Sequence, residues 1–239
     1  SITLMKWFPM ISLPLFIYMG YVLSESGIAN DLYRMFHVWM GPLPGGLALG
    51  TVGLMVAVSA MNGLSVAGLA IGASIAMPEM LKRGYDKRMV TGIIQAGSSI
   101  GLMMPPSVVL VLYGMIARQP VSTLWIAGIG PALLLAAMLT LYIVIRCKLN
   151  PALAPALSKE ELASISPEER RRLLRAGLLP LVIIVAVTGS FLTGMASLVE
   201  SSAVGALVAT LAAYFKKRLT RKVMNVALVQ TLSVSCMFM

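Results

Sequence analysis

The sequence predicts an all-α, polytopic membrane protein, on three observations. Apolar residues make up 58% of the 239 residues and charged residues only 12%, whereas a soluble domain carries roughly 25% charged residues. The mean hydropathy is +0.88. The apolar residues gather in stretches of about twenty, the length of helix that crosses a bilayer, and short basic clusters separate these stretches.

The first two elements have different patterns. Residues 2–24 form one apolar stretch long enough for a first span. Residues 28–40 instead divide between two faces when they are placed on a helix. The apolar face carries Leu32, Met35, Phe36, Trp39 and Met40. The opposite, polar face carries Asp31, Arg34 and His37. This pattern predicts an amphipathic helix that lies in the membrane interface.

Residues 45–79 are almost uncharged, but the polar stretch SAMNGLS, from Ser59 to Ser65, interrupts them. Two interpretations fit: two full crossings of the bilayer, or a re-entrant hairpin that enters and leaves on one side. Each arm offers only about 15 to 17 apolar residues, which is marginal for a crossing. The turn also lacks the charged residues and prolines usual in a turn outside the bilayer, so the hairpin is favoured.

Basic clusters orient the remaining spans. One cluster lies at residues 82–88, KRGYDKR, and another at residues 216–222, KKRLTRK. The positive-inside rule puts both clusters in the cytoplasm. With both clusters inside, residues 89–117 and 176–193 are predicted to cross the bilayer outward, and residues 122–145 and 198–214 to return.

A hydrophilic linker, residues 146–175, joins the two apolar halves. Ser166, Pro167 and Glu169 form a capping-box pattern with proline at the first helical position, so we expect a short helix to start there. Ser197 and Glu200 have capping-box spacing before a later apolar stretch, and we favour a helix cap there over a functional acid.

The predicted span at residues 89–117 contains two adjacent prolines, Pro105 and Pro106. Proline has no amide hydrogen, so the carbonyl groups of Gly101 and Leu102 are expected to lose the helical hydrogen bonds that they would otherwise accept. The span is therefore expected to consist of two half-helices around a group of free oxygen atoms.

The oxygen atoms at this break favour an ion site. Ser98, Ser99 and Ser107 add hydroxyl groups to the freed carbonyls, and such oxygens suit a hard, weakly polarising cation better than a soft metal. The alternative is a proline kink that neighbouring helices, serine hydroxyls or water repair. If the hairpin is re-entrant, its turn lies at the depth of the break, and two unwound elements that meet at the midplane are typical of a secondary transporter.

Other classes of function find little support in the sequence. Cys147, Cys236 and His37 have no metal-binding or redox spacing. The spans offer no paired carboxylates and no Ser-His-Asp set, so we expect no enzyme and no catalytic residue. The net charge of +10 comes from clusters that lie between spans, so we expect a lipid bilayer and no nucleic acid as partner.

Four segments resemble the large membrane subunit of the tripartite ATP-independent periplasmic (TRAP) transporters: residues 14–29, PLFIYMGYVLSESGIA; residues 80–86, MLKRGYD; residues 97–114, GSSIGLMMPPSVVLVLYG; and residues 125–136, WIAGIGPALLLA. The resemblance covers nearly the whole chain, and the double-proline segment is its most specific part. It implies an elevator-type symporter in the bacterial inner membrane, with Na+ as the coupling ion. It also implies an organic-acid substrate of dicarboxylate or sugar-acid type, a periplasmic binding protein that delivers it, and a small membrane subunit.

The resemblance further implies that a sodium ion lies between the hairpin turn and the broken helix. Its ligand positions would be Asn62, Gly63 and Ser65 at the turn and Ser98, Ser99, Gly101, Pro105, Pro106 and Ser107 at the break. The turn reads NGLS where the family more commonly has Ser-Gly-Ser. An amide oxygen can replace a hydroxyl as ligand, so a sodium site is compatible with this change.

The resemblance also implies how the chain is divided. We expect a span and an interfacial arm helix at residues 1–44, the ion-binding hairpin and broken helix at 45–118, a span and linker at 119–175, and the start of a second, inverted repeat at 176–239. A second hairpin and second broken helix are expected after Met239, and a helix before Ser1, so this chain alone should not transport. Two alternatives stay open: another elevator-type ion-coupled anion symporter, and a non-transporting membrane scaffold.

Overall fold

The computed structural model describes residues 8–238 except residues 42, 44, 64, 151–152 and 155–166. The described residues are almost all helical and contain no β-strand, as predicted. The α-helices are α2 (Ser12–Glu25), α3 (Ile28–Met40), α4 (Gly46–Asn62), α5 (Ser65–Ile71), α6 (Met77–Lys82), α7 (Lys87–Ile100), α8 (Val108–Ala117), α9 (Val121–Leu149), α11 (Pro167–Leu192), α12 (Leu198–Phe215) and α13 (Arg221–Phe238). A 3₁₀-helix, η1 (Phe8–Ile11), and a π-helix, η2 (Gly72–Ala76), complete the set.

Three of these helices are long and apolar enough to cross a membrane. They are α9, residues 168–192 of α11, and α12, and they contain most of the spans predicted at residues 122–145, 176–193 and 198–214. Helices α4 and α8 are apolar but shorter. The protein is therefore an all-α membrane protein.

Helix α2 lies inside the helix bundle. Phe16, Ile17 and Met19 are almost completely buried, because α12 and α13 pack on this helix. We predicted a first span over residues 2–24; the α-helix is described from Ser12 onward, and residues 1–7 lie outside the described part.

Helix α3 packs against α4 and α11. Leu32 and Met35 are buried, as the amphipathic pattern predicts, but Tyr33 and Val38 are buried as well, and Trp39 is 47% exposed. The buried side of the helix thus extends beyond the predicted apolar residues, to Val38 and to Tyr33, which lies near Glu79, Arg83 and Tyr85. The placement of α3 in a membrane interface stays a prediction.

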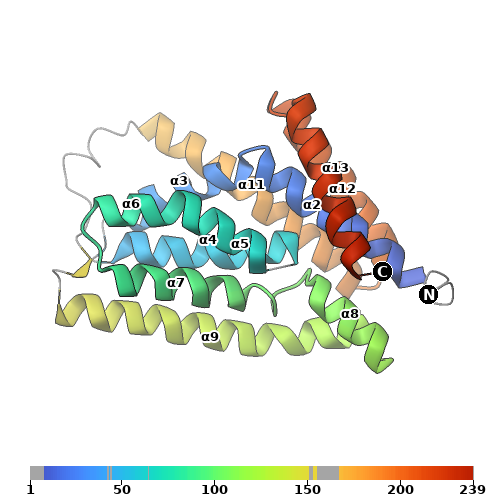
Figure 1. Ribbon diagram of the computed structural model, residues 1–239, viewed down its shortest axis with the longest axis horizontal. Helices are drawn as coiled ribbons and strands as arrows, with labels where there is room; N and C mark the ends of the chain where they lie inside the picture. The colour runs from blue at the N-terminus through green and yellow to red at the C-terminus, as the bar shows by residue number, and fades with distance from the viewer. Residues whose placement is uncertain are drawn as a thin grey trace.

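Helix α4 and the continuous helical run α5–η2–α6 form a hairpin that turns at Gly63. Gly63 has a φ of +62°, a left-handed conformation that glycine adopts without strain, so the turn at this position agrees with the sequence prediction. The hairpin packs on α7, and α4, α7 and α9 run side by side along the long axis of the molecule (Figure 1).

The predicted break in the span at residues 89–117 is confirmed. Helix α7 ends at Ile100, α8 begins at Val108, and residues 101–107 between them are not helical. The hairpin stops at the level of this break, whereas α8 continues past it (Figure 1). A hairpin that crossed the whole bilayer would reach as far as α8, so this arrangement favours the re-entrant interpretation.

The linker prediction needs a correction. We expected a short helix from Pro167 and a separate span from residue 176, but α11 is one helix that runs through both regions. The segment after Pro167 is rich in Glu, Arg and Leu, which favour helix, and Gly177 lets the helix pass close to Met35 of α3. Ser166, the predicted cap, lies outside the described residues.

Candidate functional site

The hairpin turn and the helix break meet in the structure. Gly63, at the turn, lies so close to the start of α8 that a Cβ atom on it would be 2.5 Å from the backbone nitrogen of Val108. Only glycine fits at this contact, which also needs the positive φ of Gly63. Two of the segments that the sequence analysis singled out are therefore direct neighbours.

Ser59 fills the centre of this junction. It lies one turn before the end of α4 and is completely buried. A Cβ atom on Gly68 of α5 or on Gly101 of the break would overlap Ser59, so α4, α5 and the break approach one another through this side chain. The Oγ atom of Ser59 is buried and has no hydrogen-bond partner among the described residues.

The break rearranges the backbone hydrogen bonds at the end of α7. The amides of Leu102, Met103 and Met104 donate to carbonyls three residues earlier, at 3.2, 3.1 and 3.3 Å, a tightening that is common at helix ends. Met104 thereby donates to the Gly101 carbonyl, so our prediction that this carbonyl has no partner is wrong.

The prediction for Leu102 is correct. The carbonyl groups of residues 102–106 accept no hydrogen bond from the described residues. Unpaired carbonyls away from water cost free energy unless another group binds them. One of them, that of Met103, lies against Gly128 of α9, where a Cβ atom would be 2.7 Å from the oxygen.

The three predicted serine ligands at the break differ in their surroundings. Ser98 and Ser99 both donate to the carbonyl of Gln95, at 3.0 and 2.9 Å, which leaves their oxygen lone pairs free to accept. Ser98 is buried and Ser99 is exposed. Ser107 is buried and caps α8 by accepting from the Leu110 amide at 3.2 Å.

The structure therefore brings some of the predicted ligand positions together. Ser98 and Gly101 lie beside Ser59 and Gly68, and Gly63 lies beside Val108. Ser99 is exposed instead. Two further predicted positions, Pro105 and Pro106, are buried, and Ser65 is half-buried. The side chain of Asn62 lies outside the described part, and all of these residues stay predicted ligands.

Four helix ends meet at the junction: the C-termini of α4 and α7 and the N-termini of α5 and α8 (Figure 1). The last carbonyls of α4 and α7 carry the negative ends of their dipoles, and the first amides of α5 and α8 the positive ends. Among the described residues no group of three or more His, Cys, Asp or Glu side chains could hold a metal ion. Carbonyl and hydroxyl oxygens are thus the donors available here, and they suit a hard cation.

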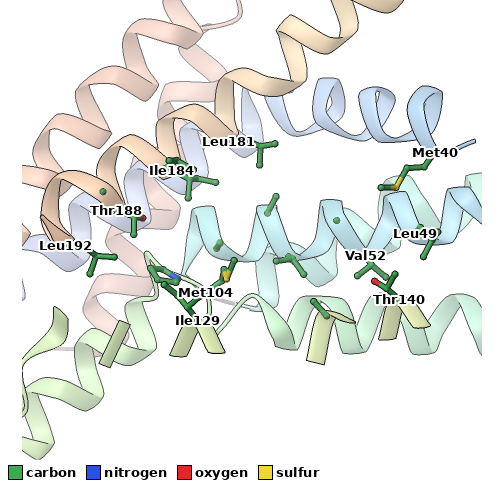
Figure 2. A pocket seen from close by; sticks show the side chains of 18 residues that line it. Met40, Leu49, Val52, Met104, Ile129, Thr140, Leu181, Ile184, Thr188 and Leu192 are labelled. Carbon is green, nitrogen blue, oxygen red and sulfur yellow. The ribbon is translucent and has the colours of Figure 1, made fainter. Parts of the chain in front are cut away.

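A large pocket lies on the other side of the break. It has a volume of about 620 Å³ and is formed by α4, α9, α11 and the break, with Met104 and Pro105 in its wall. Figure 2 shows Met104 and Ile129 at one end with Thr188, and Met40, Leu49 and Thr140 toward the other. The described residues that line it are mostly apolar, and Thr140 and Thr188 add two hydroxyl groups.

Sequence reasoning missed two contacts at the site. Ser59 is part of the polar stretch SAMNGLS but was not among the predicted ligands, although it lies one helical turn before Asn62 and thus on the same face of α4. Gly128 lies within a continuous apolar stretch of α9, and nothing local in the sequence distinguishes it from a helix-packing glycine.

Comparisons with known proteins bear on the whole chain. The family model described as "Tripartite ATP-independent periplasmic transporter, DctM component" matches residues 1–239. A C4-dicarboxylate TRAP transporter large permease protein, DctM, of Pseudomonas aeruginosa is 31% identical over 88% of this chain and 48% of its own length. The ectoine TRAP transporter large permease protein TeaC of Halomonas elongata is 32% identical over 84% of this chain and 46% of its own.

A third relative is the sialic acid TRAP transporter permease protein SiaT of Haemophilus influenzae, which is 27% identical over 95% of this chain and 36% of its own length. The chain thus spans about half the length, or less, of these curated relatives. All three are permease proteins, in agreement with the expectation that this chain is not an enzyme.

Proposed function

This chain belongs to the family of DctM components of tripartite ATP-independent periplasmic transporters, and we propose that it carries one ion-binding half of a sodium-coupled importer of small organic acids. Its partners would be a small membrane subunit and a periplasmic binding protein, in the inner membrane of a bacterium. The observation that carries the sodium proposal is the buried, unpartnered Ser59 hydroxyl beside the break.

Two further observations support a cation at this place. The Ser98 hydroxyl has lone pairs free, and the carbonyls of residues 102–106 accept no hydrogen bond from the described residues. Sodium would coordinate these oxygens and hold the hairpin turn against the break. Half-helix starts such as that of α8, which begins at the same junction, are where transporters of this type bind anionic substrate groups.

The proposed substrate class rests on the relatives. Their names include transporters of C4-dicarboxylates and of sialic acid, and also of ectoine, so an organic acid is the class that we propose. The membrane potential would contribute about 2.3 kcal/mol per net charge carried inward per 100 mV. That energy corresponds to a concentration ratio of roughly fifty.

Replacement of Pro105 and Pro106 by alanine tests the proposal in the complete permease with its partner proteins. Alanine supplies amides to the carbonyls of Gly101 and Leu102 and permits a continuous helix. We expect sodium-driven uptake of a dicarboxylate to fall at least tenfold, since the carbonyl of Leu102 would no longer be free to bind an ion. Pro131→Ala is the matched control, because Pro131 lies inside α9 and is exposed, and it should leave uptake unchanged.

The scaffold alternative gives the opposite result. The close packing of Ser59 with Gly68 and Gly101 is also what a purely structural helix contact requires. A protein that only holds other helices in place would tolerate or benefit from an unbroken helix. Unchanged sodium-driven uptake in the double alanine variant would therefore reject the proposed ion site.

A further inference from the structure

A second recess lies between the start of α7 and the last turns of α9, on the face that the positive-inside rule assigns to the cytoplasm. Its volume is about 530 Å³. Arg88 and Arg146 line it at the helix ends, and Gly92, Ile93 and Leu139 form apolar walls. Helices α7 and α9 are direct neighbours along this stretch (Figure 1).

The two arginines of this groove have no acidic partner among the described residues. Arg88 and Arg146 are both exposed. Asp86 also lines the groove, but its Oδ1 atom accepts the Met89 amide at 3.0 Å and caps α7. There the positive end of the helix dipole offsets its charge, so the groove attracts an anion.

The apolar part of the groove is open. A Cβ atom on Gly92 would meet nothing within 4 Å, and only 11% of the apolar part of α9 is buried. Leu139 lies two helical turns, or about 10 Å, from Arg146 along α9. The groove thus leads from two free guanidinium groups at a helix end to an apolar channel nearer the middle of the helices. Tyr142, which is 51% exposed, lies between them, as aromatic side chains do at headgroup level.

We propose that this groove binds an anionic phospholipid, with its phosphodiester between Arg88 and Arg146 and one acyl chain along Gly92, Ile93 and Leu139. Arginine pairs suit phosphate oxygens, and basic pockets between helices on the cytoplasmic side bind anionic headgroups. The site does not depend on sodium binding or on the substrate. A zwitterionic lipid would find the same apolar channel but would gain less from the two arginines.

Native mass spectrometry of the delipidated, complete permease tests this. The probes are phosphatidylglycerol and phosphatidylethanolamine with the same acyl chains. We expect wild type to retain phosphatidylglycerol preferentially, and Arg88→Gln with Arg146→Gln to weaken that binding about twenty-five-fold, since each basic residue near a membrane contributes a factor of about five. Phosphatidylethanolamine binding should change by less than a factor of about two. Arg171→Gln with Lys222→Gln, two exposed basic residues elsewhere, should leave phosphatidylglycerol binding unchanged.

A second variant tests the acyl channel. Gly92→Leu fills the open space and should weaken phosphatidylglycerol about tenfold, the contribution of roughly two buried methylene groups. Gly130→Leu, at another open glycine, should leave it unchanged. Excess inorganic phosphate should not displace the lipid, and displacement would show a site for a free anion. Displacement of the lipid by phosphate would overturn the proposal. Equal phosphatidylglycerol binding in wild type and the double arginine variant would overturn it too. So would the absence of bound phosphatidylglycerol in wild type, because another segment would then fill the groove.

Discussion

A single hydroxyl group decides how the junction between hairpin and break should be understood. Ser59 is fully buried, and glycines at positions 68 and 101 let two other segments touch it. Its Oγ atom has no partner among the described residues, and an unsatisfied buried hydroxyl costs about 1–3 kcal/mol. A pure packing contact would do better with alanine, so the serine is better explained as a ligand to something that binds there.

Ser59→Ala separates these roles. If Ser59 binds sodium, the variant should lose most of the sodium-dependent rise in unfolding temperature, while in sodium-free buffer it should be about 1 kcal/mol more stable because an unsatisfied group is gone. Thermal unfolding in detergent with sodium, and with potassium or choline in its place, measures both effects.

Ser235→Ala is the matched control for that experiment. Ser235 lies on α13, is buried, and also has an unpartnered Oγ atom, so it should gain stability without any change in the response to sodium. A sodium response that survives in Ser59→Ala at full size would remove Ser59 from the ligand set.

Gly101→Ala tests the close approach itself. A Cβ atom here overlaps Ser59, and overpacking of this kind costs about 1–3 kcal/mol. We expect the free energy of unfolding to fall by about 2 kcal/mol, and Ser59→Gly in the same chain to recover part of the loss. Gly130→Ala, with open space around it, should be neutral or slightly stabilising; a loss of equal size there would show that the effect is not steric.

At the scale of helices, the sequence predicts those features that local chemistry controls. The break at Pro105 and Pro106 follows from two missing amides, and the turn at Gly63 follows from the Asn-Gly pair. The hydrogen bond from the Met104 amide to the Gly101 carbonyl could not be predicted. The change from i+4 to i+3 hydrogen bonds depends on how residues 101–104 pack against α4 and α9. The continuity of α11 was missed for a related reason: α3 supports the helix at Gly177.

The cap of α12 is a helix-scale prediction that the structure confirms. The Ser197 amide donates to Glu200 Oε2 at 2.7 Å, and the Glu200 amide donates to Ser197 Oγ at 3.3 Å, which completes a capping box. Ser197→Ala should raise the rate of hydrogen exchange at the first-turn amides of α12 about fivefold, equivalent to the roughly 1 kcal/mol that a cap contributes.

Transport should not change in that variant, because we assign Ser197 and Glu200 to the helix start alone. Thr193→Ala, in the preceding loop, is the control, since the Thr193 hydroxyl donates to the carbonyls of Gly189 and Ser190. Lost uptake at normal α12 protection would give Glu200 a functional role instead.

At the scale of the whole molecule, contacts between the first and last parts of the chain fix the arrangement. Asp31 of α3 binds Lys216 at 3.0 Å and Arg218 at 2.8 Å, both beyond the end of α12. Arg218 also donates to the Gly27 carbonyl, and Lys216 to that of Ala176. The sequence placed Asp31 on a polar helix face, but periodicity says nothing about a partner 185 residues away, so neither this contact nor the central position of α2 could be predicted.

Asp31→Asn tests whether this contact holds the two parts together. The Asp31 side chain is only 14% exposed, and the change leaves two cations without their carboxylate, so we expect the free energy of unfolding to fall by about 3 kcal/mol. A double-mutant cycle with Lys216→Met should give a coupling of about 1 kcal/mol or more, because both substitutions remove the same interaction. Glu79→Gln is the control: Glu79 pairs with Arg83 at i,i+4 spacing, and its side chain is 33% exposed against 14% for Asp31, so its loss should cost no more than about 0.5 kcal/mol. Equal losses in the two variants would mean that Asp31 contributes only as an ordinary surface charge, and that helix packing, of α2 against α12 and α13 and of α3 against α11, joins the two parts.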